Sequence, residues 1–317
     1  MNPMNSKALI TGGAGFIGSN LADALVARGW GVTVLDNLST GHLSNLARVK
    51  DKITFIEGDI RDSKAVKAAG KGCDVIFHQA AVVSVPQTVQ MPVESAMVND
   101  IGTLTVLEAA RKNGSRRIVL ASSCAVYGDE PTLPKTEAMP LKPMSPYAVQ
   151  KMGGEYYARL YHELYGVETV CLRYFNVYGP RQDPSSPYSG VISIFLTRVA
   201  EKKQPVIYGD GDQSRDFIFV QDVVKANILA ATTPGVSGSV FNIGTGHAVT
   251  VNHLWDSICR LENVQIDAIH QSPRPGDIRH SLANIASAKE SLGFSPDYVF
   301  EDGLALTYGW YQKSAVS

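Results

Sequence analysis

Apolar runs alternate with helical spacings along the first 175 residues of the chain. Runs rich in Val and Ile, each bounded by Gly, Asp or Ser, predict strands at residues 7–11, 31–36, 53–59, 73–81 and 116–123. Ile17, Leu21 and Leu25 have helical spacing, as do the apolar residues of 93–114, where Gly114 suits the position after a helix. Strands that alternate with helices predict an α/β fold with a doubly wound parallel sheet, covered on both faces.

The second half of the chain is less regular. Residues 167–180 predict one more sheet strand that runs into a loop. Loops rich in Pro, Gly and Asp then alternate with predicted helices at 191–203 and 250–262. We therefore expect residues 1–175 to form the doubly wound domain, with some later segments returning to its sheet. Residues 176–317 should form mainly a smaller lobe.

The composition limits the classes of partner. Of the 317 residues, 44% are hydrophobic and 19% are charged, which is enough apolar material for a packed core. The net charge of −1 argues against a surface dedicated to nucleic acid or to an anionic membrane, and we interpret Arg116 and Arg117 as a solvated turn before a strand. The chain has no apolar run of membrane-spanning length and no signal-peptide run, so we expect a cytoplasmic protein without a membrane partner.

Four cysteines lie at scattered positions: Cys73, Cys124, Cys171 and Cys259. They form no C-x-x-C pair and have no His-paired zinc spacing. We predict reduced thiols in an intracellular protein and no metal site.

Glycines follow the first predicted strand in the sequence TGGAGFIG, residues 11–18. A glycine-rich turn between a strand and a helix lets a pyrophosphate approach backbone N–H groups and the positive end of the helix. Asp36 ends the next predicted strand, where its carboxylate can accept hydrogen bonds from an adenosine ribose and would repel a 2′-phosphate. Asn37, Leu38 and Ser39 supply no arginine for such a phosphate. The sequence thus favours NAD over NADP, and a structural turn that binds nothing is the alternative.

Polar residues at the later strand ends have two interpretations each. Asp59 follows the third strand and either faces the adenine or is an ordinary strand-end aspartate. We interpret His78 as a core histidine with satisfied hydrogen bonds, and the small Ala80 and Ala81 after it as room for a cofactor across the sheet edge. Asn99, on the next helix, is either a polar helix-face residue or a cofactor contact.

A tyrosine and a lysine lie four residues apart in SPYAVQK, residues 145–151. Pro146 can begin a helix, and Tyr147 and Lys151 then lie on one face of it. An ammonium close to a phenol favours the phenolate and lowers its pKa from about 10, which makes a base that can take a proton from an alcohol. A surface aromatic residue beside a solvated lysine is the alternative for this pair taken alone.

These features, in this order, resemble the extended short-chain dehydrogenases/reductases, and most closely the UDP-hexose 4-epimerases. The resemblance runs from about residue 7 to residue 312. Beside the glycine turn and YAVQK, its motifs are SSCAVYG (122–128), RYFNVYGPRQ (173–182), YGDGDQSRDFIFVQDV (208–223), FNIGTG (241–246) and RPGD (274–277). It implies a Rossmann-type NAD-binding domain with a smaller C-terminal substrate-binding lobe, NAD as the cofactor and a UDP-sugar as the substrate.

The resemblance also implies a redox-neutral reaction. Tyr147 takes the proton of the sugar 4-hydroxyl while its hydride goes to the nicotinamide, and the 4-keto sugar then receives the hydride on its other face. Lys151 bonds the nicotinamide ribose and, with the cationic ring, lowers the pKa of Tyr147. Ser123 bonds the same sugar oxygen, with Ser122 as the alternate. Cys124 is interpreted as a small packing residue.

The implied binding residues fall into two sets. The cofactor set consists of Gly12, Gly15, Phe16, Ile17, Gly18, Asp36, Asn37, Ser39, Asp59, Ile60, Gln79, Ala80, Ala81, Asn99, Tyr147, Lys151 and Tyr174. The substrate set consists of Ser84, Ser123, Asn176, Val191, Tyr208, Arg215, Arg274, Asp277 and Ser281. For the two arginines, which would hold phosphate oxygens, the alternative is a surface salt bridge, and for Val191 and Tyr208 it is simple packing.

Related chemistries differ in the residues that follow the catalytic serine. Sugar-nucleotide 4,6-dehydratases have an Asp-Glu pair there, and UDP-glucuronate decarboxylases typically have a glutamate in the same segment. Cys124, Ala125 and Val126 offer no carboxylate, so we exclude both reactions. A UDP-glucuronate 4-epimerase stays open, as does a non-catalytic NAD-sensing protein of the same fold, although such proteins usually lose the Tyr or the Lys.

The resemblance further predicts substrate breadth and assembly. Ser281 is the fourth residue after the Asp of RPGD, where a tyrosine restricts the family to plain hexoses and a small residue admits an N-acetyl group. We expect UDP-GlcNAc and UDP-GalNAc to be accepted as substrates, as well as UDP-Glc and UDP-Gal. If the alignment with the family is shifted by one residue, His280 or Leu282 occupies this position instead of Ser281. Family likeness also favours a homodimer in which helices 92–113 and 145–165 form a four-helix contact.

Overall fold

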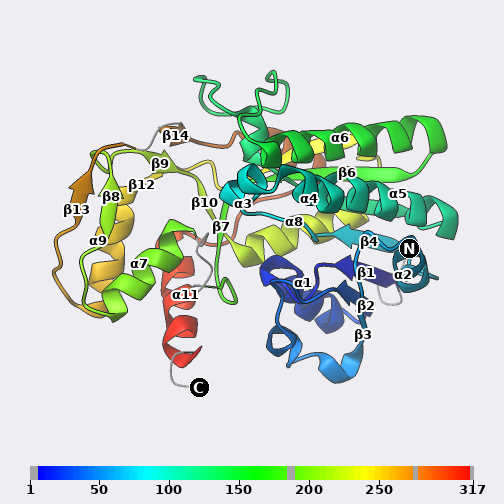
Figure 1. Ribbon diagram of the computed structural model, residues 1–317, viewed down its shortest axis with the longest axis horizontal. Helices are drawn as coiled ribbons and strands as arrows, with labels where there is room; N and C mark the ends of the chain where they lie inside the picture. The colour runs from blue at the N-terminus through cyan, green and yellow to red at the C-terminus, as the bar shows by residue number, and fades with distance from the viewer. Residues whose placement is uncertain (1–5, 184–189, 274–277, 315–317) are drawn as a thin grey trace.

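A computed structural model describes residues 6–183, 190–273 and 278–314 of the chain. Figure 1 shows a larger part around one sheet on the right of the view and a smaller part on the left. The sheet has seven strands in the order β11-β6-β5-β4-β1-β2-β3, and all neighbours in it are parallel. This confirms the predicted doubly wound sheet, with the order reversing between β1 and β4.

The sheet strands follow the predicted apolar runs but are shorter at some ends. Their bounds are β1 Lys7–Thr11, β2 Gly31–Asp36, β3 Ile53–Glu57, β4 Val75–His78, β5 Arg117–Ser123, β6 Glu168–Tyr174 and β11 Ser239–Ile243. The predicted strand 53–59 stops at Glu57 because its only neighbour, β2, ends at the paired Asp36. β11 is a later segment that returns to the main sheet, as predicted, by pairing with β6.

Helices cover both faces of the sheet, and the alternation along β1 shows why. Ala8 and Ile10 point to the core under α1 (Phe16–Ala27) and α8 (Val220–Thr232). Leu9 points to the opposite core, under α2 (Ser63–Ala69), α5 (Gly102–Asn113) and α6 (Pro146–Tyr165). Strands buried on both faces need apolar residues at every position, which is the pattern in the sequence.

The predicted helix 93–114 is divided into three segments. It consists of α4 (Pro92–Ala96), a π-helical turn over Met97–Ile101 and α5, and it ends at Gly114 with a left-handed φ of 69°. A short helix, α3 (Val85–Gln90), precedes it and was not predicted. The π turn contains Asn99, whose side chain bonds the loop after β4.

In the smaller part, three helices pack against two strand pairs and one three-stranded sheet. The helices are α7 (Val191–Ala200), α9 (Val251–Glu262) and α11 (Phe300–Ser314), and their core includes Phe195, Trp255, Ile258 and Leu304. The strands are β7 (Asn176–Tyr178) with β10 (Phe217–Phe219), β8 (Val206–Tyr208) with β13 (Ile269–Gln271), and β9 (Ser214–Arg215) between β12 (Val249–Thr250) and β14 (His280–Ser281). The helix predicted at 191–203 ends at Ala200.

Four short helical segments complete the described elements: η2 (Leu43–Leu46), η3 (Lys50–Lys52), η5 (Cys124–Tyr127) and α10 (Ala286–Leu292). Within the described ranges, no helix has both the length and the apolar character needed to cross a membrane.

The interpretation of Arg117 as a solvated turn residue is wrong. Its side chain is buried at the start of β5, where it donates to Glu168 Oε2 at 2.8 Å and to the carbonyl oxygens of Ala230 and Thr233. The end of α8 lies over this edge of the sheet, and the guanidinium satisfies carbonyls that the helix leaves without intrahelical partners. Burial in the sheet follows from the topology and not from the local sequence.

Candidate active site

The turn between β1 and α1 packs directly on the end of β4. Gly12 has a left-handed φ of 68°, and a Cβ there would lie 2.7 Å from Ala80 N. A Cβ on Gly18 would lie 2.2 Å from the carbonyl oxygen of Gly12. Both positions therefore require glycine for close approach. Gly15 is the N-cap of α1, and the first helical residues are Phe16 and Ile17.

Asp36, at the end of β2, joins the glycine turn to the following loop. Its Oδ2 accepts a hydrogen bond from Ala14 N at 2.9 Å, and its Oδ1 accepts one from Leu38 N at 2.8 Å. The carboxylate is buried beside the turn, at the edge where the sequence predicts an adenosine ribose. No basic side chain occurs among residues 37–41, which fits a ribose without a 2′-phosphate.

Asn37 and Asp59 contact each other across the ends of β2 and β3. Asn37 Nδ2 donates to Asp59 Oδ2 at 2.9 Å, and Asn37 Oδ1 accepts from Ser39 N at 3.1 Å. Hydrogen bonds from Arg61 hold the pKa of Asp59 well below its usual range. The carboxylate of Asp59 thus already has protein partners, while Ile60 beside it is buried. Contact of Asp59 with an adenine stays a prediction.

The loop after β4 is held by amide side chains. Asn99 accepts from Val82 N at 2.8 Å and donates to Val82 O and to Gln150 Oε1. Gln79 Nε2 donates to Tyr174 OH at 3.2 Å and to Asn227 Oδ1 at 3.1 Å. These bonds place Ala80 and Ala81 beside the glycine turn, and Ser84 beyond them caps α3. Neither Gln150 nor Asn227 was among the predicted site residues.

His78 is a core histidine, as predicted. Its ring is buried between the hydroxyls of Thr11 and Thr103, at 2.8 and 3.0 Å. Burial lowers the pKa of His78 to about 3, so the ring stays neutral at physiological pH.

Ser123, Tyr147 and Lys151 come together at the carboxyl end of β5. Pro146 begins α6, and Ser145 caps it by accepting from Ala148 N at 3.2 Å. Tyr147 lies beside Ser123, whose hydroxyl favours the ionised form of the phenol. The ammonium of Lys151 donates to Ala121 O at 2.8 Å and lies 5.8 Å from the centre of the Tyr147 ring. The three predicted catalytic residues therefore form one cluster.

The protein alone does not make Tyr147 acidic, contrary to the expectation from the Tyr–Lys spacing. Burial raises the pKa of Tyr147 to about 12, and the hydrogen bond with Ser123 only partly opposes it. Burial also lowers the pKa of Lys151 to about 8. The ammonium of Lys151 donates to a backbone carbonyl. Its attraction for a phenolate at Tyr147 is smaller than the free-energy cost of burying that phenolate.

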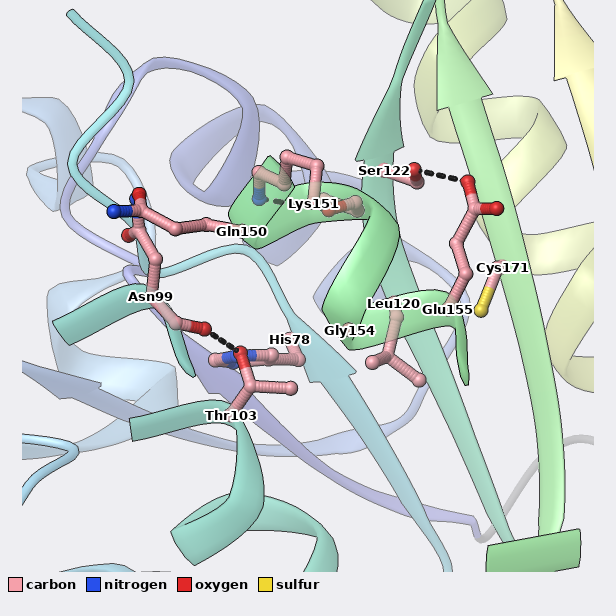
Figure 2. A pocket seen from close by; sticks show the side chains of 11 residues that line it. His78, Asn99, Thr103, Leu120, Ser122, Gln150, Lys151, Gly154, Glu155 and Cys171 are labelled. Carbon is pink, nitrogen blue, oxygen red and sulfur yellow. Dashed lines mark hydrogen bonds between the residues drawn. The ribbon is translucent and has the colours of Figure 1, made fainter. Parts of the chain in front are cut away.

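Ser122 and Ser123 point to opposite sides of the strand, as neighbours in β5 must. Ser122 donates to Glu155 in a buried network, shown beside Lys151 in Figure 2. Ser123 Oγ faces Tyr147 and accepts from Ala125 N at 3.2 Å. Ser123, and not the alternate Ser122, is therefore the serine that lies beside Tyr147.

Ser281 lies next to the catalytic segment. It pairs in register with Arg215, and it lies beside Cys124, whose ionised form its hydroxyl favours. Burial raises the pKa of that thiol to about 11, which suits a packing residue. His280, by contrast, is exposed and bonds Ser214 Oγ at 2.9 Å. The structure therefore places Ser281, and not His280, beside Cys124.

The other predicted substrate residues lie in the smaller part. Asn176 donates to Asp216 O through its backbone N–H and its Nδ2, at 3.0 and 3.1 Å. Arg215 Nη1 donates to Ser214 O at 3.0 Å and to Arg279 O at 3.2 Å. Val191 begins α7 and Tyr208 ends β8, both only partly buried. Arg274 and Asp277 lie outside the described residues.

Asp216 organises this region and was missed in the sequence. Its buried carboxylate accepts from Thr245 N and Oγ1, both at 2.7 Å, from Gly246 N at 2.9 Å and from Ala283 N at 3.1 Å. Burial raises its pKa. It joins three segments that are far apart in the sequence. The one sequence feature that could have indicated its importance is its position next to Arg215 in the motif at 208–223.

The model of the NAD dependent epimerase/dehydratase family matches residues 8–244. The chain belongs to this family. A Methanocaldococcus jannaschii protein named as a putative UDP-glucose 4-epimerase is 42% identical over 308 residues, covering 96% of this chain and 98% of that protein.

Solved structures agree with this membership. UDP-N-acetylglucosamine 4-epimerase from Methanobrevibacter ruminantium M1, in complex with UDP-N-acetylmuramic acid, has a TM-score of 0.94 at 40% identity and covers 98% of this chain and 99% of its own. UDP-glucose 4-epimerase from Thermus thermophilus, in complex with NAD, has a TM-score of 0.87 at 36% identity over 96% of this chain and 99% of its own.

Membership in the epimerase/dehydratase family confirms NAD as the cofactor and an epimerase as the class of enzyme. The residues present fit NAD. A Cβ at Gly12 or Gly18 would collide with nearby backbone, and Asp36 lies at the ribose position of the fold. Within the described ranges, His, Cys, Asp and Glu side chains nowhere form a group able to hold a metal ion.

Proposed function

We propose that the protein is a UDP-hexose 4-epimerase that works through a 4-keto sugar. The observation behind this proposal is the cluster of Ser123, Tyr147 and Lys151 at the end of β5, with Cys124 and Ala125 after the serine. A carboxylate after the serine would permit elimination or decarboxylation, and this segment has none. The cluster retains a proton acceptor, a cation and a hydroxyl donor, so it supports reversible oxidation of an alcohol.

Each residue of the cluster has a role at a stated atom. NAD, when bound, accepts and returns the hydride. Tyr147 takes the proton from the sugar 4-hydroxyl through its phenol oxygen and later returns it. Ser123 lies beside Tyr147 and would hold the same sugar oxygen. Lys151, fixed by Ala121 O, supplies a positive charge 5.8 Å from the centre of the phenol ring.

We propose that the substrates include UDP-GlcNAc and UDP-GalNAc as well as UDP-Glc and UDP-Gal. Ser281 is small, and it lies against Cys124, one residue from Ser123. A small side chain at this point leaves room for a substituent on the sugar. The relative from Methanobrevibacter ruminantium M1, a UDP-N-acetylglucosamine 4-epimerase, supports the inclusion of acetylated sugars.

The smaller part is the proposed site for the UDP moiety. Asn176 donates to the backbone carbonyl of Asp216, the chain neighbour of Arg215, and Ser281 on β14 pairs with Arg215. Residues 1–175, with β11 and α8, would then hold NAD, and the later segments would hold the nucleotide sugar. Arg274 and Asp277 are proposed for this site on the RPGD motif alone.

We further propose a cytoplasmic homodimer. Two neighbouring helical segments expose apolar side chains on one side each, and together we call them the apolar helical face: Val93, Met97, Ile101, Val149, Tyr156, Leu160 and Leu164. Figure 1 shows α4, α5 and α6 side by side on the upper right. An exposed apolar area of this kind marks an association surface. The free thiols of all four cysteines suit a reducing compartment.

The test is an assay of the purified protein with UDP-GlcNAc, UDP-Glc and UDP-glucuronate in turn, following formation of the 4-epimer. We expect turnover of the first two and NADH absorbance that appears slowly in the presence of substrate. Exclusive turnover of the acid would overturn the proposed substrate class. Bound NAD without any sugar-dependent reduction would support a sensor instead.

Tyr147→Phe should lower kcat by about 10²- to 10⁴-fold, because it removes the proton acceptor. Bound NAD and the thermal midpoint should stay at wild-type values. Tyr161→Phe is the matched control, since this tyrosine lies on the same helix and bonds Glu108 near the surface. Full activity of Tyr147→Phe would contradict the proposed mechanism.

A further inference from the structure

One stripe of α6 contacts three consecutive residues at the end of β5. Tyr147, Lys151 and Glu155 are four residues apart and lie on the same side of the helix. Tyr147 lies beside Ser123, Lys151 donates to Ala121 O, and Glu155 accepts from Ser122 Oγ. The first two residues of the stripe belong to the catalytic cluster, and the third is an acid that the proposed mechanism does not use.

Glu155 is buried, and its carboxylate bonds residues at the catalytic end of the sheet. Arg173 donates to it twice, through Nε at 2.9 Å and Nη2 at 2.7 Å, and Ser122 donates to its Oε1. Figure 2 shows the bond between Ser122 and Glu155 beside the Lys151 side chain. Arg173 directly precedes Tyr174 on β6, so these bonds tie α6 to both β5 and β6.

The ion pair is part of a longer buried network. Arg173 Nη1 donates to Tyr127 OH at 2.8 Å, and the guanidinium stacks 4.9 Å from the centre of that ring. Tyr127 OH donates to Asn242 Oδ1 at 2.7 Å on β11. Every member has a partner of the right kind, so the network is rigid and specific in geometry. It fixes η5, which follows Ser123, as well as α6.

Resting on the proposed function, we propose that Glu155 is a positioning residue for the epimerase reaction. Its bonds to Ser122 and Arg173 set the rotation of α6 about its axis, so that Tyr147 meets Ser123 and Lys151 meets Ala121 O. A helix held only at its first turn can rotate or shift. A third contact two turns later removes that freedom at the point where the phenol must meet the sugar oxygen.

The charge of Glu155 also acts on Lys151. The titratable groups that face Lys151 are Tyr147 and Glu155 on α6, His78 on β4 and Cys171 on β6. Burial lowers the pKa of Lys151 to about 8, and Cys171 and Glu155 oppose that shift. Burial raises the pKa of the Cys171 thiol, which is therefore neutral, so the opposing charge comes from the carboxylate of the Glu155–Arg173 ion pair. Loss of its charge should lower the pKa of Lys151 further.

The test is Glu155→Gln in the NAD-loaded protein, with Glu168→Gln as the control. Glu168 pairs with buried Arg117 across the same two strands, β5 and β6, but at their opposite end. For Glu155→Gln we expect kcat to fall about 10- to 100-fold, with KM and bound NAD near wild-type values. The alkaline limb of the kcat profile should move down by about 0.5 to 1 pH unit, since Lys151 loses its proton earlier. Glu168→Gln should change neither.

A kcat within twofold of wild type for Glu155→Gln, or a lower kcat with an unmoved alkaline limb, would overturn the proposal. If Glu155→Gln does not fold, Ser122→Ala is the deciding variant. It removes the hydrogen bond from Ser122 to Glu155 and leaves the ion pair between Glu155 and Arg173. A kcat at least threefold lower supports the proposal, and an unchanged kcat overturns it.

If the wild type turns over no UDP-hexose, the proposed function fails separately. Amide hydrogen exchange in the first two turns of α6 then tests whether Glu155 positions the helix. We expect this exchange to be faster in Glu155→Gln than in Glu168→Gln.

Discussion

Tyr147 and Lys151 are ionisable groups inside the protein, and burial acts on them in opposite directions. It raises the pKa of the phenol to about 12 and lowers that of the ammonium to about 8. Both shifts disfavour a charged form in a medium of low polarisability. For Tyr147 to act as the proposed proton acceptor, the positive charge of oxidised NAD would have to act on it in addition to that of Lys151.

Ser281→Tyr should narrow the enzyme to plain hexoses. A tyrosine beside Cys124 fills the space that a 2-acetamido group needs, and overpacking of this kind lowers kcat/KM for UDP-GlcNAc by about 10- to 100-fold. Turnover of UDP-Glc should stay within a few-fold of wild type. The measurement is kcat/KM for both sugars.

His280→Tyr is the matched control for that substitution. His280 is the neighbour of Ser281 on β14, but its side chain is exposed and bonds Ser214. Selectivity should therefore stay at the wild-type ratio. A loss of UDP-GlcNAc turnover in His280→Tyr alone would show that the pocket residue is not Ser281.

His78 makes the protein sensitive to acid. Its folded pKa is about 3, whereas an unfolded histidine has a pKa near 6.5, so between these values the unfolded state binds a proton that the folded state does not. Stability then falls as the pH falls through this window, by about 3 kcal/mol between pH 6.5 and pH 4. His78→Gln removes the titrating group, so its unfolding free energy should fall less steeply from pH 6.5 to pH 4.5. Identical slopes in urea unfolding would contradict this prediction.

At the scale of elements, the turn from β1 to α1 and the face of α6 do most to build the site. The turn is narrow because the backbone of Gly12 lies against β4 and that of Gly18 lies against Gly12. The helix is placed by its proline start, its serine cap and the stripe that contacts β5. The turn lies where the strand order reverses, between β1 and β4, and the stripe of α6 contacts the carboxyl end of β5, the next strand. Ligands of open α/β sheets bind at this edge.

Gly18→Ala should weaken NAD binding by at least about tenfold. The added Cβ would lie 2.2 Å from Gly12 O, so the start of α1 must move away from the turn that receives the pyrophosphate. The measurement is the amount of NAD retained on purification and the Kd after reloading. Gly31→Ala is the control, since its Cβ would meet only the flexible side chain of Lys7 at 3.3 Å. Equal NAD retention in both variants would argue against this account.

At the scale of the molecule, one region of the surface stands out as a candidate for association. The apolar helical face exposes Val93 by 70% and Leu164 by 66%, on neighbouring helical segments. Side chains at positions 149, 156, 160 and 164 share one side of α6, so a second copy related by a twofold axis can cover the face.

Leu164→Glu should turn the proposed dimer into a monomer. A carboxylate without a partner in an apolar interface costs about 3 kcal/mol, which raises the dissociation constant about 100-fold. Sedimentation velocity at micromolar concentration measures the change. Leu306→Glu is the control, because this leucine is similarly exposed but lies on α11 in the smaller part. A wild-type protein that is already monomeric would refute the proposed assembly.

The sequence by itself determined the features whose causes are local. The alternation of apolar strands and helices, the glycine turn, the Pro146 start of α6 and the spacing of Tyr147 to Lys151 all depend on neighbouring residues, and the structure has each of them. The family motifs added Ser123, which lies beside Tyr147 in the structure, and its role in the reaction stays a prediction.

The tertiary structure decided what depends on residues distant in the sequence. Arg117 is buried because α8 ends over it. The Asp216 carboxylate accepts hydrogen bonds from segments that are remote in the sequence. Glu155 faces Ser122 only because α6 packs on β5. It also decided the sign of the pKa shift at Tyr147. Burial depends on what covers a side chain, and no local pattern of residues contains that information.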